Sequence, residues 1–199
     1  MVRRLPSSVP FASLLVYSPR GTSKVSKDSR TVCYDIKQGR PDTVTRAVTR
    51  LAEVWEAKGM KDFFGPNVIL VPAPKSAPLV QSALWPAHVI CREIVKQGLA
   101  KAIQPALKRV TRVTKSAGAK ERPDIHKHME TMKATPWLSD GGAPRVTIVD
   151  DVITKGATLY AGCVLIREAM PEADVRLFAL VRTMSQGDVA EILLLVLVW

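Results

Sequence analysis

The stretch 146–158 reads Val-Thr-Ile-Val-Asp-Asp-Val-Ile-Thr-Lys-Gly-Ala-Thr, and it constrains the fold of this chain more than any other segment. Its first four residues have the composition of a buried strand, and the adjacent carboxylates of Asp150 and Asp151 follow at once. A Thr-Lys-Gly-Ala-Thr turn then opens onto a segment with helical periodicity. A strand, a polar turn and a helix in this order predict one βα unit of an open α/β sheet.

A unit of this kind carries its polar residues at the carboxyl end of a strand, where open α/β sheets bind ligands. The carboxylates of Asp150 and Asp151 suit sugar hydroxyls, and two adjacent like charges need a cation or a set of donors. The backbone N–H groups and hydroxyls of the turn 154–158 lie at a helix N-terminus, which is a natural anion site. A phosphorylated sugar suits both, since its hydroxyls can meet the carboxylates and its phosphate can meet the turn.

A nucleoside triphosphatase could use the same acidic pair to hold Mg²⁺. That reading requires a Gly-x4-Gly-Lys-Ser/Thr loop upstream of the acids. The most similar stretch, Ser-Pro-Arg-Gly-Thr-Ser-Lys at 18–24, lacks the required spacing. We therefore exclude a P-loop enzyme.

Strand-like and helix-like patterns alternate along the rest of the chain. Continuous apolar runs at 68–71 and 175–181 predict strands that are buried on both faces. Apolar residues that recur at steps of four, three and four predict a helix ending at Gly59; they are Val44, Val48, Leu51 and Trp55. The other expected elements are strands over 31–36 and, weakly, 107–110, and helices over 86–97 and 159–170. The alternation predicts a doubly wound, mainly parallel sheet.

The length of 199 residues suits one well-buried domain, which we expect over 31–185. Residues 1–30 are expected to contribute to a small variable hood, and 186–199 form an apolar tail. The stretch 111–140 shows no clean period and predicts a long mobile loop. His126 and His128 fall in this loop, where we expect no metal role.

Charge and cysteine usage limit the partners and the compartment. With 29 Lys and Arg against 18 Asp and Glu, the net charge of +11 indicates a polyanionic partner. Nucleic acid, an acidic membrane surface and a phosphorylated small molecule all qualify, but no aromatic residues are interleaved with the basic ones, as in single-strand binders. The three cysteines are unpaired by count, which favours a reducing, cytoplasmic setting.

The last eight residues, 192–199, are all apolar. They are far fewer than the roughly 20 residues that a membrane-spanning helix needs. We therefore expect no membrane partner and interpret this terminus as a buried or interface strand, which makes a homodimer plausible.

The stretch 146–158 resembles the phosphoribosyl pyrophosphate (PRPP) signature of type I phosphoribosyltransferases. Three further segments resemble the ComF-like, competence-associated branch, which has a Lys-x-x-Gly-Arg segment, a Val-Pro-x-Pro loop and a Leu-x-Arg segment with Thr, Gln and Arg downstream. They are Tyr34-Asp-Ile-Lys-Gln-Gly-Arg, Val71-Pro-Ala-Pro, and Leu107-Lys-Arg-Val-Thr-Arg-Val-Thr with Ser116 and Arg122. The resemblance covers roughly residues 30–183 and implies the same α/β fold.

The resemblance implies a role for each matching residue of the donor site. Asp150 and Asp151 would bind the ribose 2′ and 3′ hydroxyls. The residues that would surround the 5′-phosphate are those of the turn: Thr154, Lys155, Gly156, Ala157 and Thr158. Lys155 stands where the family usually has a small residue, so it either adds a cation to the phosphate site or points into solvent.

The resemblance also implies a leaving-group site. Lys75 and Ser76 would meet the pyrophosphate, and Arg109 with the basic segment behind it would correspond to a mobile loop that closes over PRPP. Mg²⁺ would bridge the ribose hydroxyls and the pyrophosphate, with Asp150 and Asp151 as further candidate ligands. After Val-Pro-Ala-Pro, however, the chain has Lys-Ser-Ala-Pro-Leu in place of the family's Arg-Gly-Phe-Asn.

Two functions therefore stay open. The first is a Mg²⁺-dependent phosphoribosyltransferase that joins ribose 5-phosphate to a nitrogen acceptor, a nucleobase or a related compound, and releases pyrophosphate. The second is a non-catalytic PRPP-sensing or nucleic-acid-binding regulator on the same fold. The expected hood carries no readable signature of the acceptor.

Overall fold

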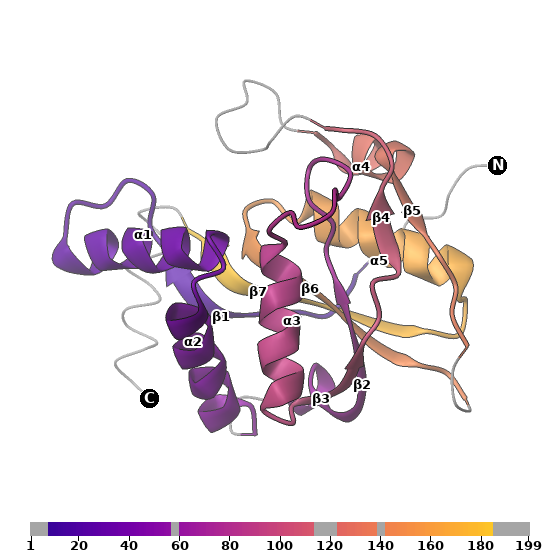
Figure 1. The fold of residues 1–199 in the computed structure, drawn as a ribbon, viewed down its shortest axis with the longest axis horizontal. Coiled ribbons are helices and arrows are strands. Elements are labelled where there is room, and N and C mark those ends of the chain that lie inside the picture. Colours follow the sequence, from indigo (N-terminus) through magenta and orange to yellow (C-terminus); the bar gives the residue numbers. More distant parts are fainter. Residues whose placement is uncertain (1–7, 57–59, 114–122, 139–141, 185–199) are drawn as a thin grey trace.

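Five parallel strands form the central sheet, in the order β1-β7-β6-β2-β3 (Figure 1). Their bounds are Phe11–Tyr17 for β1, Gly65–Pro72 for β2, Ala100–Ile103 for β3, Arg145–Ile153 for β6 and Asp174–Thr183 for β7. This computed structural model describes residues 8–56, 60–113, 123–138 and 142–184. Both faces of an all-parallel sheet are normally buried, so the placement of the helices on its two faces defines the fold.

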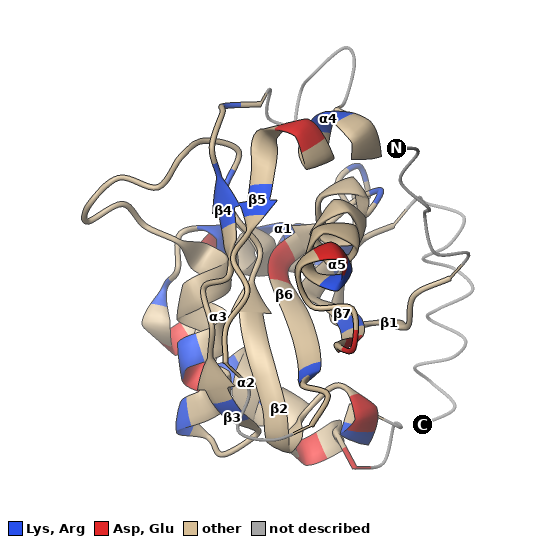
Figure 2. Cartoon of the chain, turned by 90° about the vertical axis from the view of Figure 1, so that its right-hand side faces the viewer, with Lys and Arg blue, Asp and Glu red and all other residues tan. Residues whose placement is uncertain are grey.

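Helices cover both faces of this sheet. One face carries α1 (Lys24–Lys37), α2 (Pro41–Val54) and α3 (Pro86–Lys96), and the other carries α5 (Ala157–Ala169), as Figure 2 shows. Alternate residues of a strand point to opposite faces, and β7 illustrates this: Phe178 packs in the core under α1–α3, whereas Leu177 packs in the core under α5. The doubly wound, mainly parallel sheet is thus confirmed.

A small antiparallel sheet lies outside the main one. It pairs β4 (Leu107–Arg109) with β5 (Met132–Ala134), and the short helix α4 (Ile125–Thr131) leads directly into β5. Both α4 and β5 pack against α5, so this unit covers the outer side of that helix. A 3-10 turn at Met60–Asp62 precedes β2.

The strand expected over 31–36 is wrong, because these residues belong to α1. The Ser23 side chain accepts a hydrogen bond from the Ser26 N–H and caps the start of this helix. Cys33 and Ile36, three positions apart, are its buried apolar residues. The mixture of Val, Cys, Tyr and Ile in 31–36 has strand-type composition, but the cap lies outside that window and sets the helix.

The mobile loop expected over 111–140 is also wrong in part, since α4 and β5 lie within it; residues 114–122 and 139–141 fall outside the described ranges. The strand expected at 107–110 is confirmed as β4. Residues 11–17 form β1 and pair with β7, and the boundary expected at residue 30 falls inside α1. The apolar tail 186–199 lies outside the described residues. No helix in the described part is long and apolar enough to cross a bilayer.

The centre of the sheet sets the stability of the fold. Ile148 on β6 is fully buried between the sheet and α5. We expect Ile148→Ala to lower the free energy of unfolding by about 2–5 kcal/mol, because it removes apolar contacts and leaves a cavity. Denaturant titration followed by circular dichroism measures this loss. The control is Val25→Ala, because Val25 is 63% exposed on α1 and should change stability by no more than about 0.5 kcal/mol.

Candidate functional site

The sheet has a switch point between β2 and β6. These strands are neighbours, but β2 leads to α3 on one face and β6 leads to α5 on the other. The pairing of β2 with β6 ends at Pro72 and Val149, whereas β6 continues beside β7 as far as Ile153. The two following loops therefore diverge at the carboxyl ends of the strands, which is where doubly wound sheets bind ligands.

The acidic pair lies on the part of β6 that extends beyond β2. We expected the strand to end at Val149, but pairing with β7 carries it through Asp150 and Asp151. Asp150 Oδ1 accepts a hydrogen bond from the Asp151 N–H at 2.9 Å, and Asp151 Oδ1 accepts one from the Val152 N–H at 2.8 Å. Both side chains are half-buried, and each of them has a second carboxyl oxygen with which to meet a ligand.

Ionisation of both carboxyl groups of the pair is unfavourable in the absence of a ligand. Burial, followed by the charge of Asp151, raises the pKa of Asp150 well above its ordinary value, and Lys37 opposes this shift. A bound cation or a set of hydroxyl donors would stabilise the ionised form of Asp150. The site therefore favours a ligand that brings either one.

The turn after β6 presents donors to the same region. Gly156 has φ +76°, a left-handed conformation that an L side chain rarely adopts, and it directly precedes α5. No side chain caps this helix, so the N–H groups of Ala157, Thr158 and Leu159 have no acceptor within it. The helix expected after the turn is confirmed, and its first turn has the geometry of an anion site.

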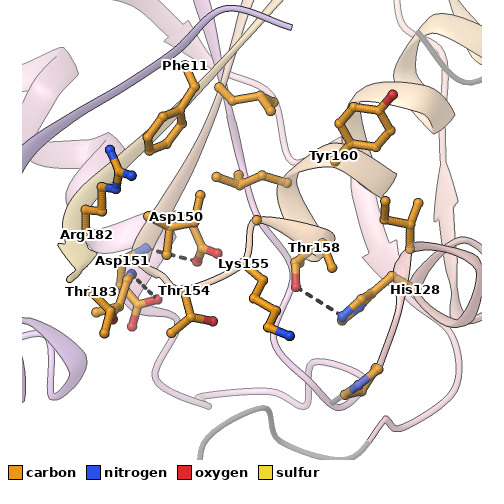
Figure 3. A pocket seen from close by; sticks show the side chains of 18 of the residues that line it. Phe11, His128, Asp150, Asp151, Thr154, Lys155, Thr158, Tyr160, Arg182 and Thr183 are labelled. Carbon is orange, nitrogen blue, oxygen red and sulfur yellow. Dashed lines mark hydrogen bonds between the residues drawn. The ribbon is translucent and has the colours of Figure 1, made fainter. Parts of the chain in front are cut away.

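One pocket of about 1430 Å³ joins the acidic pair to the turn (Figure 3). Its lining includes Asp150, Asp151, all five turn residues and Ser76. The pocket exceeds the roughly 300–1,000 Å³ of an ordinary small-molecule site, so it has room for more than one ligand. Ser76 and the residues of 150–158, which belong to two separate segments of the sequence, thus lie at one pocket in the structure.

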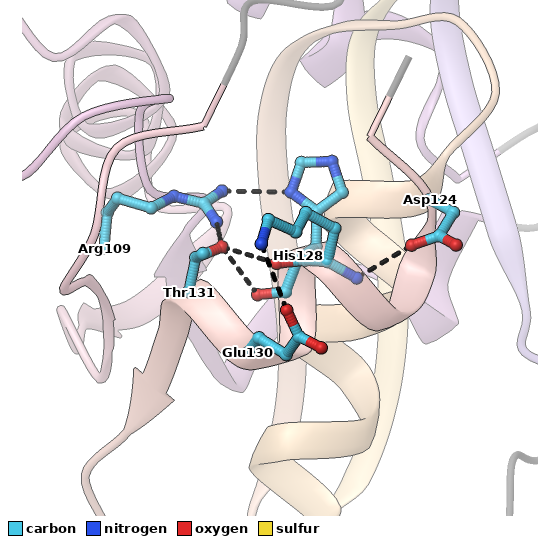
Figure 4. A network of polar contacts seen from close by, with 6 residues as sticks. Arg109, Asp124, His128, Glu130 and Thr131 are labelled. Carbon is cyan, nitrogen blue, oxygen red and sulfur yellow. Dashed lines mark hydrogen bonds and ion pairs between the residues drawn. The ribbon is translucent and has the colours of Figure 1, made fainter. Parts of the chain in front are cut away.

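Lys75 and Arg109 do not line this pocket. Lys75 is exposed, and the Arg109 side chain is only 5% exposed and held in place (Figure 4). Its guanidinium donates to the Lys75 carbonyl oxygen at 3.0 Å, to Thr131 Oγ1 at 2.7 Å and to His128 Nδ1 at 3.2 Å. Burial lowers the pKa of Arg109 to about 10. Arg109 is thus a fixed cation beside the site.

The pocket lining also includes residues that were not selected from the sequence, among them the basic or titratable side chains of Lys37, His128 and Arg182. His128 lies on α4, with its Nε2 3.4 Å from Thr158 Oγ1, and is not in a loop as expected. The signal for that helix was Asp124, whose side chain accepts a hydrogen bond from the Lys127 N–H and caps α4. Lys37 is the last residue of α1 and belongs to the Lys-Gln-Gly-Arg segment noted above.

The donor set fits a metal only if the ligand supplies part of the coordination. In the described ranges, no group of three or more His, Cys, Asp or Glu side chains could hold an ion. Mg²⁺, however, commonly binds one or two carboxylates and takes its remaining ligands from water and substrate phosphates. Asp150 and Asp151 fit that mode.

No family model matches the chain, and no curated protein matches it either. Among solved structures, adenine phosphoribosyltransferase from Leishmania tarentolae matches with 14% identity and a TM-score of 0.43 over 84% of this chain and 91% of the other. Adenine phosphoribosyltransferase from Leishmania donovani matches with 16% identity and a TM-score of 0.39, over 85% of this chain and 75% of the other. Purine phosphoribosyltransferase from Pyrococcus horikoshii Ot3 matches with 18% identity and a TM-score of 0.35, over 70% of this chain and 85% of the other.

The raised pKa of Asp150 predicts a pH-dependent stability. Because its carboxyl group binds its proton more tightly in the folded state, ionisation destabilises the fold as pH rises above the ordinary value of 3.8. Asp150→Asn should therefore raise the free energy of unfolding at pH 7 in metal-free buffer, and the gain should shrink as pH falls toward 3.8. Denaturant titrations at several pH values measure this. A gain that does not change with pH would show that ionisation of Asp150 is not its source.

Proposed function

We propose that this chain is a PRPP-binding phosphoribosyltransferase, which transfers ribose 5-phosphate to a nitrogen acceptor and releases pyrophosphate. The observation that carries the proposal is the shared pocket at the switch point, where a carboxylate pair faces the uncapped N-terminus of α5. Hydroxyl-binding and phosphate-binding groups are thus held on one rigid βα unit. The resemblance of 146–158 to the PRPP signature supports the same ligand.

In this proposal the βα unit holds the ribose 5-phosphate part of PRPP. The free carboxyl oxygens of Asp150 and Asp151 accept hydrogen bonds from the 2′ and 3′ hydroxyls. The 5′-phosphate accepts hydrogen bonds from the N–H groups at the start of α5 and from the hydroxyls of Thr154 and Thr158. Lys155 is exposed at the pocket and adds a positive charge to that side.

Displacement at C1 of the ribose builds negative charge on the pyrophosphate. Groups directed at that charge lower the barrier, and no protein nucleophile is required. Ser76, next to Lys75 in the chain, lines the pocket, and in this proposal it contacts the pyrophosphate. Bound Mg²⁺, held by Asp150 and Asp151 together with the substrate, would neutralise part of the charge.

Lys37 is a further candidate for the leaving-group side. It lines the pocket and acts electrostatically on Asp150. Lys37 therefore supplies a positive charge that the exposed Lys75 does not bring to the pocket wall. Its segment, 34–40, also carries part of the resemblance to the ComF-like branch, which we propose as the subgroup.

A non-catalytic regulator is the second candidate. It is favoured by one observation, which is that Lys75 and Arg109, both expected at the pyrophosphate, do not line the pocket. Figure 2 shows basic residues on β4 and β5, near the end of β6 that carries the acidic pair. Arg109 is buried, but the exposed Lys108 and Lys133, together with the net charge of +11, offer a surface for nucleic acid.

The donor site is tested by removing both carboxylates. Asp150→Asn with Asp151→Asn should weaken PRPP binding at least about a hundredfold in isothermal titration calorimetry with Mg²⁺, because each loses a hydrogen bond between a charged group and a hydroxyl. The matched control is Asp28→Asn with Asp42→Asn, which makes the same charge change at exposed positions of α1 and α2. Equal affinity of wild type and the site variant would end the proposal.

Turnover separates the two candidate functions. With PRPP, Mg²⁺ and one member of a panel of purines, pyrimidines and amines, we expect pyrophosphate release that depends on a particular acceptor. An enzyme-coupled pyrophosphate assay measures it, and the double Asn variant supplies the background. If no panel member gives release, while DNA or RNA is retained with an affinity that falls steeply with salt, the regulator is favoured.

A further inference from the structure

Among the residues that the structure describes, no carboxylate pairs with the buried guanidinium of Arg109. Within the described ranges no ion pair joins Arg109 to an acidic side chain, and the three groups that accept its hydrogen bonds are all neutral: a carbonyl, a hydroxyl and an imidazole. A cation removed from water without a counter-charge is costly. An anion nearby would therefore be stabilised by Arg109, even without touching it.

The hydrogen bonds from Arg109 run toward the pocket in one direction. A guanidinium has donors only, so His128 Nδ1 must accept the bond from Nη2, and the ring proton of the neutral imidazole must lie on Nε2. That Nε2–H then donates to Thr158 Oγ1, 3.4 Å away. Burial, followed by the charge of Arg109, lowers the pKa of His128 to about 4, which keeps the ring neutral at pH 7.

The Thr158 hydroxyl ends this series of bonds at the phosphate side of the pocket (Figure 3). Because its oxygen accepts from His128, its single proton is left to donate elsewhere. We propose that His128 is a positioning residue, which orients the Thr158 hydroxyl as a donor to the phosphate of the bound sugar phosphate. This inference rests on the proposed function and assigns Arg109 an indirect role there.

The direction of the series explains why a neutral histidine serves an anion site. Each bond polarises the next, so the charge of Arg109 strengthens the donor at the far end. Thr131, the last residue of α4, fits the same scheme. It accepts a hydrogen bond from Arg109, which ties α4 to β4, and donates to the Lys127 carbonyl oxygen of its own helix at 2.7 Å. The loop that carries Lys75 is tied to this network through its carbonyl oxygen.

Two substitutions of His128 test the roles of its two ring nitrogens separately. His128→Asn can keep the acceptor near Nδ1 and loses the donor at Nε2, whereas His128→Gln can keep a donor near Nε2. We expect His128→Asn to weaken binding of ribose 5-phosphate about tenfold in calorimetry, the scale of one hydrogen bond to a charged group. His128→Gln should recover part of that loss. His126→Asn is the matched control, because His126 is exposed on the same helix.

A double-mutant cycle tests whether His128 acts through Thr158. Thr158→Val should weaken binding at least as much as His128→Asn, and the two changes together should be no worse than Thr158→Val alone. Losses that multiply would overturn the proposal. Unchanged affinity of His128→Asn, with wild type binding ribose 5-phosphate, would overturn the role of His128 and leave the proposed function standing. If wild type binds neither ribose 5-phosphate nor PRPP, both fall.

The tautomer can be measured on the unaltered protein, which avoids any loss of folding in the variants. Long-range ¹H–¹⁵N correlation spectra distinguish the two nitrogens of each histidine ring, and the His128→Asn spectrum assigns the signals. We expect Nε2 protonated and Nδ1 unprotonated, both with and without saturating ribose 5-phosphate. A proton on Nδ1 in either state would reverse the series of bonds and overturn the proposal.

Discussion

The position of the pocket depends on the point where the segments that follow β2 and β6 diverge. Because β2 sends its chain to one face of the sheet and β6 to the other, the backbone opens between them just beyond Pro72 and Val149. β6 alone continues past this point, supported on one side by β7. Its carboxylates, the uncapped end of α5 and Ser76 consequently reach a common space. The pocket is thus a product of sheet topology, and a few side chains give it its polar character.

The small sheet contributes to the site without forming its wall. Arg109 lies buried on β4, which pairs with β5, and His128 on the adjoining helix α4 lines the pocket. A buried cation in this position raises the local potential while water and ligands are kept away from it. The start of α5 thus differs from an isolated helix N-terminus, because the hydrogen-bonded pair of Arg109 and His128 lies behind Thr158.

The doubly wound sheet and the polar residues of 146–158 could be predicted because both follow from local patterns. A run of apolar residues, an acidic pair and a Gly-containing turn determine one βα unit almost alone. His128 and Lys37 could not be found in this way, since their place at the pocket depends on how α4 and α1 pack against distant segments. The strand expected over 31–36 failed for a related reason, because the Ser23 cap outside that window decides the conformation.

The position of β1 has a consequence for synthesis. Among the described strands β1 is synthesised first, yet its neighbour in the sheet is β7, which is synthesised last. Until residues 174–183 have been made, both β1 and the acidic end of β6 lack the strand with which they pair in the folded sheet. Contacts between such distant segments slow folding, and apolar strands exposed in the interval are prone to aggregate. A nascent chain would therefore have to keep β1 from aggregating until β7 has been synthesised.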